Sequence, residues 1–201
     1  MIRAFLAIEL TDDLRARLAQ IQQDLTQRLS HRFPKTVRLS WVQPASIHLT
    51  IKFLGDMDEP LIEPLRIEIA QVMTEHRPVQ IPLNRLGVFP RPQQPRVLWA
   101  GPSATWEQGD DAVRVAALHR SVEARCHTLG FMPEGRPLSP HLTLARIKAG
   151  ERDVGRLLAQ DGVLDHPLSI GTLDLNAIVL MKSDLRPAGP AYTKLWEVAC
   201  R

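Results

Sequence analysis

The sequence of 201 residues has no long hydrophobic run, and its longest apolar stretches are short, such as residues 4–8. A helix that spans a membrane needs about 20 predominantly apolar residues, so we expect no membrane segment. The first residues also lack a basic stretch followed by an apolar one, which argues against a secretory signal. These two absences predict a globular protein of the cytoplasm.

Cysteine is scarce: the chain has only Cys126 and Cys200, and no Cys-x-x-Cys spacing. We therefore expect two free thiols in a reducing compartment instead of a disulfide or a zinc site. The sequence also lacks a Walker-type glycine loop and an obvious lysine motif of an ATP-dependent ligase. No metal-ligand spacing connects the histidines at positions 31, 76, 119, 127 and 166. We therefore expect no zinc site and no nucleotide cofactor.

Dense clusters of one charge are absent too. The net charge is +3, the isoelectric point is about 9.2, and the lysines and arginines are scattered without a basic tail. This mildly basic balance favours an anionic partner, and the scatter favours a small anionic ligand or an RNA end over extensive duplex binding. Nothing marks an interface, so we expect a monomer without an obligate protein partner.

The pattern of apolar residues predicts strands that alternate with amphipathic helices. Strands are expected at residues 2–10, 37–41, 47–54, 79–89, 96–101, 141–147, 168–181 and 191–199. Helices are expected after the capping residue Thr11, at about 59–76, at about 111–129 with Gly130 beyond its end, and at 151–160. Short turns between strands indicate an α+β fold with largely antiparallel sheets. Two similar halves without a flexible linker predict one bilobal domain over residues 1–201.

A tetrad of His, apolar residue, Thr and apolar residue occurs twice, at residues 48–51 and 141–144. Because side chains alternate along a strand, His48 and Thr50 share one face, and His141 and Thr143 share one face. The apolar members point the opposite way, where they can anchor each strand to the core. The four polar side chains are then available to line a cleft.

This pair of motifs suits the opening of a cyclic phosphodiester. In-line displacement at phosphorus needs a base on the side of the entering water and an acid on the side of the leaving oxygen. Histidine serves either purpose because its unperturbed pKa is about 6.5. The hydroxyls of Thr50 and Thr143 can donate to the non-bridging oxygens and stabilise the charge of the transition state. The residues alone do not fix which histidine is the acid.

The paired tetrads resemble those of the two-histidine phosphoesterase superfamily. The similarity extends to its RNA 2′,3′-cyclic phosphodiesterase branch, historically named 2′-5′ RNA ligase. It rests on six stretches that span nearly the whole chain in order: residues 3–10, 47–55, 87–90, 96–101, 136–146 and 190–192.

The resemblance implies a bilobal α+β fold, with a sheet and helices in each lobe and pseudo-two-fold symmetry about a central cleft. It implies hydrolysis of 2′,3′-cyclic phosphates of RNA or small nucleotides to 2′-phosphates without a metal ion. It also implies His48 as proton donor and His141 as proton acceptor.

Three further residues are candidates for substrate binding. The resembling family has an arginine at the position of Arg146 that reaches substrate, although alternation along an unbroken strand puts Arg146 on the face opposite His141. Phe5 offers a ring for base stacking, with a core position as the alternative. Tyr192 follows a Gly-Pro turn from which it can reach the phosphate.

Other candidates have an alternative in the fold itself. Trp41, Trp99, Phe53 and Phe89 are interpreted as core residues of strands, and the tryptophans alone are also considered as cleft residues. Arg91 and Arg96 flank the Pro-rich turn at residues 90–95. This turn either overhangs the cleft and guides a polynucleotide or is a solvated hairpin tip.

Two functions compete with hydrolysis. A 2′-5′ RNA ligase would run the same chemistry in reverse on tRNA halves, but water at about 55 M favours hydrolysis unless two ends are held together. A non-catalytic module for RNA or nucleotides would keep the cleft but needs no matched acid and base. A bell-shaped pH profile of turnover would exclude this module.

Overall fold

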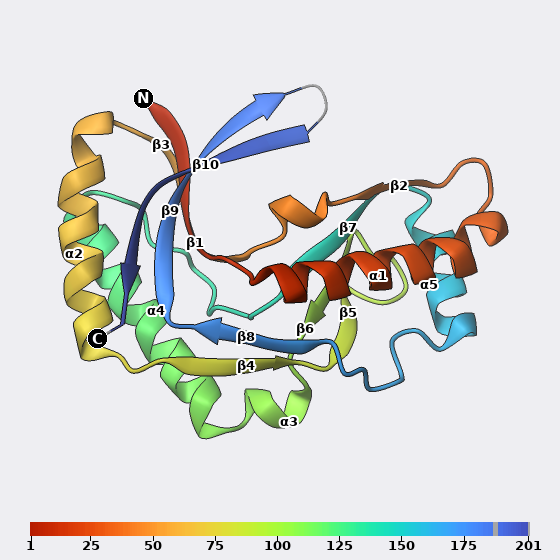
Figure 1. Cartoon of the computed structure of the whole chain (residues 1–201). Helices are drawn as coiled ribbons and strands as arrows, with labels where there is room; N and C mark the ends of the chain where they lie inside the picture. The colour runs from red at the N-terminus through yellow and green to blue at the C-terminus, as the bar shows by residue number, and fades with distance from the viewer. Residues whose placement is uncertain (187–188, 201) are drawn as a thin grey trace.

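The computed structural model describes residues 1–186 and 189–200 and contains two four-stranded antiparallel sheets (Figure 1). The first, sheet A, has the order β10 (Gly189–Ala199), β9 (Ala177–Arg186), β1 (Ile2–Ile8), β3 (Leu49–Met57). The second, sheet B, has the order β2 (Arg38–Trp41), β7 (Leu142–Ala149), β6 (Val97–Gly101), β5 (Arg85–Phe89). A two-stranded ribbon of β4 (Val79–Leu83) and β8 (Gly171–Leu175) completes the described strands. The α+β prediction with antiparallel sheets is confirmed.

Helices cover one side of each sheet. Near sheet A lie α2 (Ile62–Glu75) and α4 (Asp110–Thr128), and near sheet B lie α1 (Asp12–Leu29) and α5 (Glu151–Asp161) (Figure 1). The expected ends of two helices are confirmed: Thr11 Oγ1 accepts from the Leu14 amide at 3.3 Å, and Gly130 follows α4 with a φ of 87°. Short helical turns are α3 (Ala104–Glu107), η1 (Ser30–Arg32), η2 (Pro44–Ser46) and η3 (Glu59–Leu61).

The two lobes do not correspond to the two halves of the sequence. Strand β2 comes from the first half but pairs with β7 in sheet B. Strands β9 and β10 come from the second half but join β1 in sheet A. Helix α1 crosses in the same way, because Gln22 on this helix donates to the carbonyl oxygens of Val42 and Leu144. A strand pattern shows which face is buried but does not identify the partner strand, so the sequence could not reveal this exchange.

Two of the expected strands are each divided in two. The span 79–89 breaks at Asn84, whose amide donates to Gly101 and whose carbonyl accepts from Leu168, so β4 enters the ribbon and β5 enters sheet B. The span 168–181 breaks at Asn176, whose carbonyl accepts from the amide of Cys200. Both corrections have one cause: the apolar pattern continues while the chain changes sheets.

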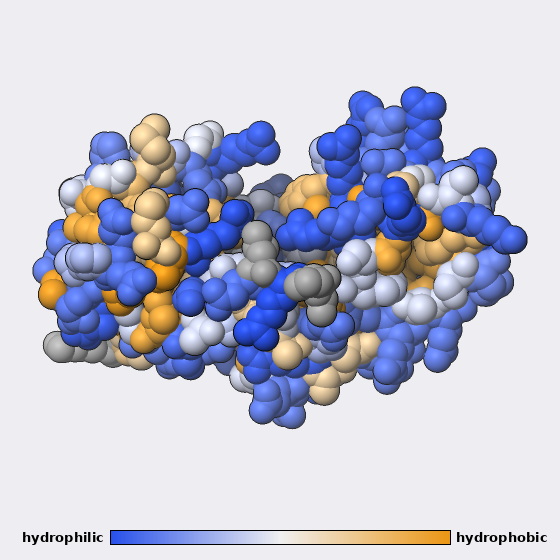
Figure 2. Space-filling view, turned by 90° about the horizontal axis from the view of Figure 1, so that it is seen from above, coloured by the Kyte–Doolittle hydropathy of each residue, from blue (hydrophilic) through white to orange (hydrophobic). Residues whose placement is uncertain are grey.

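One cluster of buried apolar side chains runs through both lobes and includes Leu6, Ile51, Val122, Leu144 and Leu158. Its continuity joins the lobes without a separating linker. Seen from above, the surface is hollowed between the two lobes (Figure 2). Within residues 1–186 and 189–200, no helix has the length and apolar character that crossing a membrane requires.

Candidate active site

Both His/Thr motifs lie at the beginning of a strand, one in each lobe. His48 immediately precedes β3 of sheet A, and His141 immediately precedes β7 of sheet B. Both histidines and both threonines, Thr50 and Thr143, line one pocket of about 370 Å³. The residues that alternate with them are buried, as expected: Leu49, Ile51, Leu142 and Leu144. The structure thus brings the predicted quartet together.

The two histidine rings are held in the same way. Nδ1 of His48 lies 2.9 Å from the carbonyl oxygen of Ser46, and Nδ1 of His141 lies 2.8 Å from that of Ser139. A carbonyl only accepts, so each Nδ1 keeps its proton and each Nε2 is the atom that titrates. The motif is therefore five residues long, Ser-x-His-Leu-Thr. This longer repeat is the sequence signal that could have revealed the contact between each Nδ1 and a serine carbonyl.

The pocket lowers the pKa of both histidines below the usual 6.5. For His48 and for His141 the largest cause is burial, which penalises the charged ring. The nearby Arg146 guanidinium lowers both pKa values further, and His141 adds to the effect on His48. The bonds to Ser46 and Ser139 act in the opposite direction. These effects favour neutral imidazoles that are ready to accept a proton at Nε2.

A β-bulge turns Arg146 into the pocket. Trp99 pairs with Thr143 and Leu98 pairs with Ala145, so Leu144 is an extra residue in β7. Leu144 and Ala145 are therefore both buried, and Arg146 lines the same pocket as His141. Simple alternation put Arg146 on the wrong face, because a bulge cannot be recognised from the apolar pattern. Within the described chain Arg146 makes no ion pair, which leaves its guanidinium available to an anion.

The first motif has the same bulge at the equivalent position. Leu6 pairs with Lys52 and Ala7 pairs with Thr50, so Ile51 is the extra residue of β3. As a result Lys52 is buried and Phe53 is 58% exposed and lines the pocket. The interpretation of Phe53 as a core residue is wrong for this reason. Phe53 occupies in one lobe the position that Arg146 occupies in the other.

Phe5 does not line the pocket. It is only 2% exposed and lies behind His48, with the two ring centroids 4.7 Å apart in a stacked arrangement. The stacking platform that we considered for Phe5 is therefore not available to a base. Tyr192 does line the pocket and contacts both rings edge-on, at 5.0 Å from Phe5 and 5.2 Å from His48. Phe5 and Tyr192 thereby fix the plane of the imidazole.

In the other lobe Phe89 and Trp99 support His141. Their ring centroids lie 5.0 and 6.4 Å from the imidazole, and Trp99 is buried as expected, whereas Phe89 is only partly buried. The indole lies over Gly87, where a Cβ atom would come within 2.1 Å of the ring. Gly87 is therefore required for the close approach of Trp99. Trp41 lines the pocket, whereas Arg91 and Arg96 line a separate one and do not overhang the histidines.

A buried ion pair supports the bulge of β3. Lys52 is fully buried, and its Nζ lies 2.7 Å from Oε1 of Glu123 and 2.9 Å from the carbonyl oxygen of Met132. The other carboxylate oxygen of Glu123 accepts from the amide of Glu134 at 3.0 Å, and Oε1 of Glu134 accepts from the amide of Phe53 at 3.1 Å. This network connects the motif strand β3 to α4, and no sequence pattern indicated it.

The pocket suits an anion by its charges. Among the described residues, its lining includes the cations Arg146 and Lys148 and contains no carboxylate. Across the described part of the chain, no group of three or more His, Cys, Asp or Glu residues is arranged to hold a metal ion. Two histidines that come from different sheets and line one pocket can supply the acid and the base that in-line displacement at phosphorus requires. The fold and this site define a phosphoesterase of the two-histidine type.

Comparison with known proteins gives the family. The chain matches the model described as LigT like Phosphoesterase over residues 8–99 and 109–192 and therefore belongs to this family of enzymes. An RNA 2′,3′-cyclic phosphodiesterase of Methanothermobacter thermautotrophicus is 31% identical over 194 residues, which are 96% of each protein. A protein of the same name from Aeropyrum pernix is 33% identical over 165 residues, 81% of this chain and 86% of the relative.

Solved structures show the same fold. A protein of Thermus thermophilus superposes with a TM-score of 0.73 and 25% identity, covering 100% of this chain and 98% of the other. LigT of E. coli in its apo form gives a TM-score of 0.69 at 22% identity, with 99% and 97% covered, and has also been solved with 3′-AMP. The bilobal architecture expected from the sequence is thereby confirmed.

Proposed function

We propose that the chain hydrolyses the 2′,3′-cyclic phosphodiester of an RNA end or a small nucleotide to a 2′-phosphomonoester. The observation that carries this proposal is the pairing of two histidines, one from each lobe, around a pocket in which Arg146 has no ion-pair partner among the described residues. The relatives that share the family are named for this activity. The proposal does not involve a metal ion, because the residues supply the base, the acid and the charge.

The two histidines divide the proton transfers. Nε2 of His141 takes the proton of the attacking water, whose oxygen forms the new bond to phosphorus. Nε2 of His48 gives its proton to the 3′ oxygen as the bond between that oxygen and phosphorus breaks. This assignment follows the resemblance to the family. The substrate's own negative charge helps His48 to hold its proton against the effect of burial.

The other polar groups of the pocket stabilise the phosphate. The hydroxyls of Thr50 and Thr143 donate to the non-bridging oxygens, and the guanidinium of Arg146 lies beside them. Phe53 presents an exposed ring at the rim of the same pocket, which suits stacking against the nucleobase. Tyr192 limits the pocket on the side of His48.

Turnover of a nucleoside 2′,3′-cyclic phosphate in excess EDTA tests the proposal. We expect wild-type activity to survive the chelator and to fall by at least about 10²-fold in His48→Ala and in His141→Ala. Activity that disappears with EDTA, or that is unchanged in both variants, would contradict the proposal. His76→Ala is a matched control, because His76 lies outside the pocket and contacts Ser121.

Hydrolysis is preferred here over the two alternatives. Ligation would use the same residues in reverse but must hold a second RNA end against water at about 55 M. A binding module has no need for two histidines whose Nδ1 atoms are both fixed. The proposed setting is the cytoplasm, where free thiols such as Cys126 and Cys200 stay reduced.

A further inference from the structure

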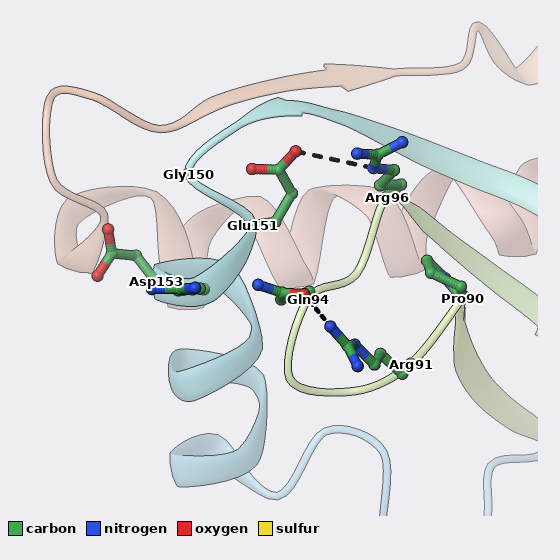
Figure 3. Close-up of a pocket in the computed structure, with 8 residues that line it drawn as sticks. Pro90, Arg91, Gln94, Arg96, Gly150, Glu151 and Asp153 are labelled. Atoms are coloured by element: carbon green, nitrogen blue, oxygen red, sulfur yellow. Dashed lines mark hydrogen bonds and ion pairs between the residues drawn. The ribbon is translucent and has the colours of Figure 1, made fainter.

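A second pocket lies between the β5–β6 turn and the beginning of α5 (Figure 3). Its volume is about 690 Å³, and it shares no lining residue with the pocket of the histidines. The turn supplies Arg91 and Arg96 and the helix supplies Arg152, so three arginines of two segments line one pocket.

The charges of this pocket are only partly compensated. Of its two carboxylates, Asp153 is paired with Arg156 outside the lining at 2.6 Å, and Glu151 lies 3.9 Å from Arg96. Arg96 is 76% exposed in spite of that contact. In the described residues Arg152 makes no ion pair and no side-chain hydrogen bond. Helix α5 has no side-chain cap at Gly150, so its first amides add positive potential to the pocket.

The walls of the pocket are held together tightly. At Gly155 of α5 a Cβ atom would lie 2.3 Å from the carbonyl oxygen of Pro92 and 3.0 Å from that of Gln93. At Gly150 a Cβ atom would lie 2.6 Å from the side chain of Val37, and φ is 79°. Helix and turn are therefore packed backbone against backbone, which fixes the positions from which the arginines extend.

Cationic side chains on β7 and the adjacent β2 lie between the two pockets. Arg146 and Lys148 line the first pocket, and Gly150 and Arg152 line the second. Arg38 of β2 pairs with Ala149 between them and is exposed. For Arg38, Arg146 and Lys148 the described chain offers no ion-pair partner. At about 3.3 Å per residue, β7 covers about 20 Å from Thr143 to its end at Ala149, enough for a few nucleotides.

We propose that this second pocket, the arginine pocket of Arg91, Arg96 and Arg152, is a second anion-binding site. It takes a backbone phosphate of the RNA strand whose 3′ end lies between His48 and His141. This inference rests on the proposed function and narrows its substrate to an oligoribonucleotide. Phosphates of one strand can pass Arg146 and Lys148 on β7 and reach Arg91, Arg96 and Arg152. A mononucleotide fills only the first pocket.

The test compares two substrates with the same terminal nucleoside: a nucleoside 2′,3′-cyclic phosphate and an eight-nucleotide RNA that ends in a 2′,3′-cyclic phosphate. We expect the triple variant Arg91→Gln/Arg96→Gln/Arg152→Gln to raise KM for the oligonucleotide at least tenfold while kcat stays unchanged. KM and kcat for the mononucleotide stay as in the wild type. An unchanged KM for the oligonucleotide overturns the proposal, as does an equal loss with both substrates.

A control variant removes the same number of charges elsewhere. Arg77→Gln/Arg114→Gln/Arg120→Gln changes exposed residues after α2 and on α4, which line neither of the two pockets. We expect no effect of the control on either substrate. If it raises the oligonucleotide KM as much as the first variant does, the effect is one of net charge and the site is refuted.

Salt dependence gives an independent measure. Each phosphate contact with a single strand contributes about 0.7 to the slope of log affinity against log salt. We expect this slope to decrease by about 0.7 for the oligonucleotide in the arginine-pocket variant and to stay unchanged in the control. An equal slope for the wild type and the arginine-pocket variant overturns the proposal.

Failure of the proposed function is distinguishable from failure of this site. If the wild type hydrolyses neither substrate, anisotropy of a fluorescent octaribonucleotide that ends in a 2′-phosphate still tests the pocket. At least tenfold weaker binding in the arginine variant supports the site, and equal binding of wild type and variant overturns it.

Discussion

At the scale of single residues, the orientation of each motif histidine is set by a carbonyl group two positions before it and by an aromatic ring beside it. The Nδ1 contacts to Ser46 and Ser139 leave Nε2 as the titrating atom, and the rings of Phe5 and Phe89 set the imidazole planes. Two neutral histidines in equivalent settings are alternative bases until the charge of a substrate raises the pKa of one of them.

The first prediction concerns pH. Burial and the Arg146 charge both lower the pKa of His48 and of His141, so the neutral forms persist to lower pH than in free histidine. We expect both limbs of the kcat/KM profile of the wild type to lie below about pH 6.5. Arg146→Gln removes one cause of the lowering and shifts the bell to higher pH, with a lower maximum because a phosphate contact is lost. Initial rates between about pH 4.5 and 8.5 check this, and a bell that moves to lower pH would contradict it.

The second prediction concerns Phe53. Stacking of an aromatic ring on a base contributes about 1–3 kcal/mol, so Phe53→Ala should raise KM by about 5- to 150-fold and leave kcat nearly constant. Phe53→Tyr keeps the ring and serves as the matched control. Steady-state kinetics with a nucleoside 2′,3′-cyclic phosphate give both constants. Stacking is refuted if the alanine variant keeps the KM of the wild type.

Residues that follow from local rules could be predicted, and residues displaced by a bulge could not. The quartet of His48, Thr50, His141 and Thr143 needs only strand alternation over three positions. Arg146 and Phe53 lie beyond an extra residue, so alternation assigns them to the wrong face. The burial of Phe5 depends on its neighbours in β3 and β9, which no single strand reveals.

At the scale of secondary structure elements, the two bulged strands β3 and β7 carry the site, and buried contacts hold them in place. The helices were predicted within a few residues because caps such as Thr11 and Gly130 are local signals. The strand pairs were not, because the partners of β4 and β8 depend on contacts distant in sequence.

The third prediction concerns the ion pair beneath β3. Lys52→Met leaves the carboxylate of Glu123 buried without its partner, which should lower the free energy of unfolding by about 3–5 kcal/mol. Denaturant unfolding measures the loss. The double variant Lys52→Met/Glu123→Met removes both charges and should be more stable than the single variant. A single variant as stable as the wild type would show that the pair does not support the strand.

The fourth prediction concerns the contact between β5 and β6. Gly87→Ala places a methyl group against the indole of Trp99, which costs about 1–3 kcal/mol if the strands cannot separate. Because Trp99 contacts His141, kcat should fall as well. Gly135→Ala is the control, since no atom lies within 4 Å of its new Cβ. Thermal unfolding and kcat check the pair, and equal values for both variants would contradict the account.

At the scale of the whole molecule, two lobes built from exchanged segments meet at one pocket, and each contributes one histidine. The repeat of the motif indicated two lobes, but the chain order of their strands was hidden because β2, β9 and β10 pair across the halves. The second pocket at α5 was hidden for the same reason. Its arginines come from segments that are distant in sequence, and only the packing of the turn against the helix brings them together.

The central claim is in-line hydrolysis between His48 and His141, and phosphorus NMR in ¹⁸O-labelled water tests it most directly. With a nucleoside 2′,3′-cyclic phosphate and excess EDTA, we predict a 2′-phosphate as the only product, with one labelled oxygen on phosphorus. We predict that this product forms at least about 10²-fold more slowly with His48→Ala and with His141→Ala. A 3′-phosphate, a mixture of isomers, or product formation by both variants at the rate of the wild type would contradict the account.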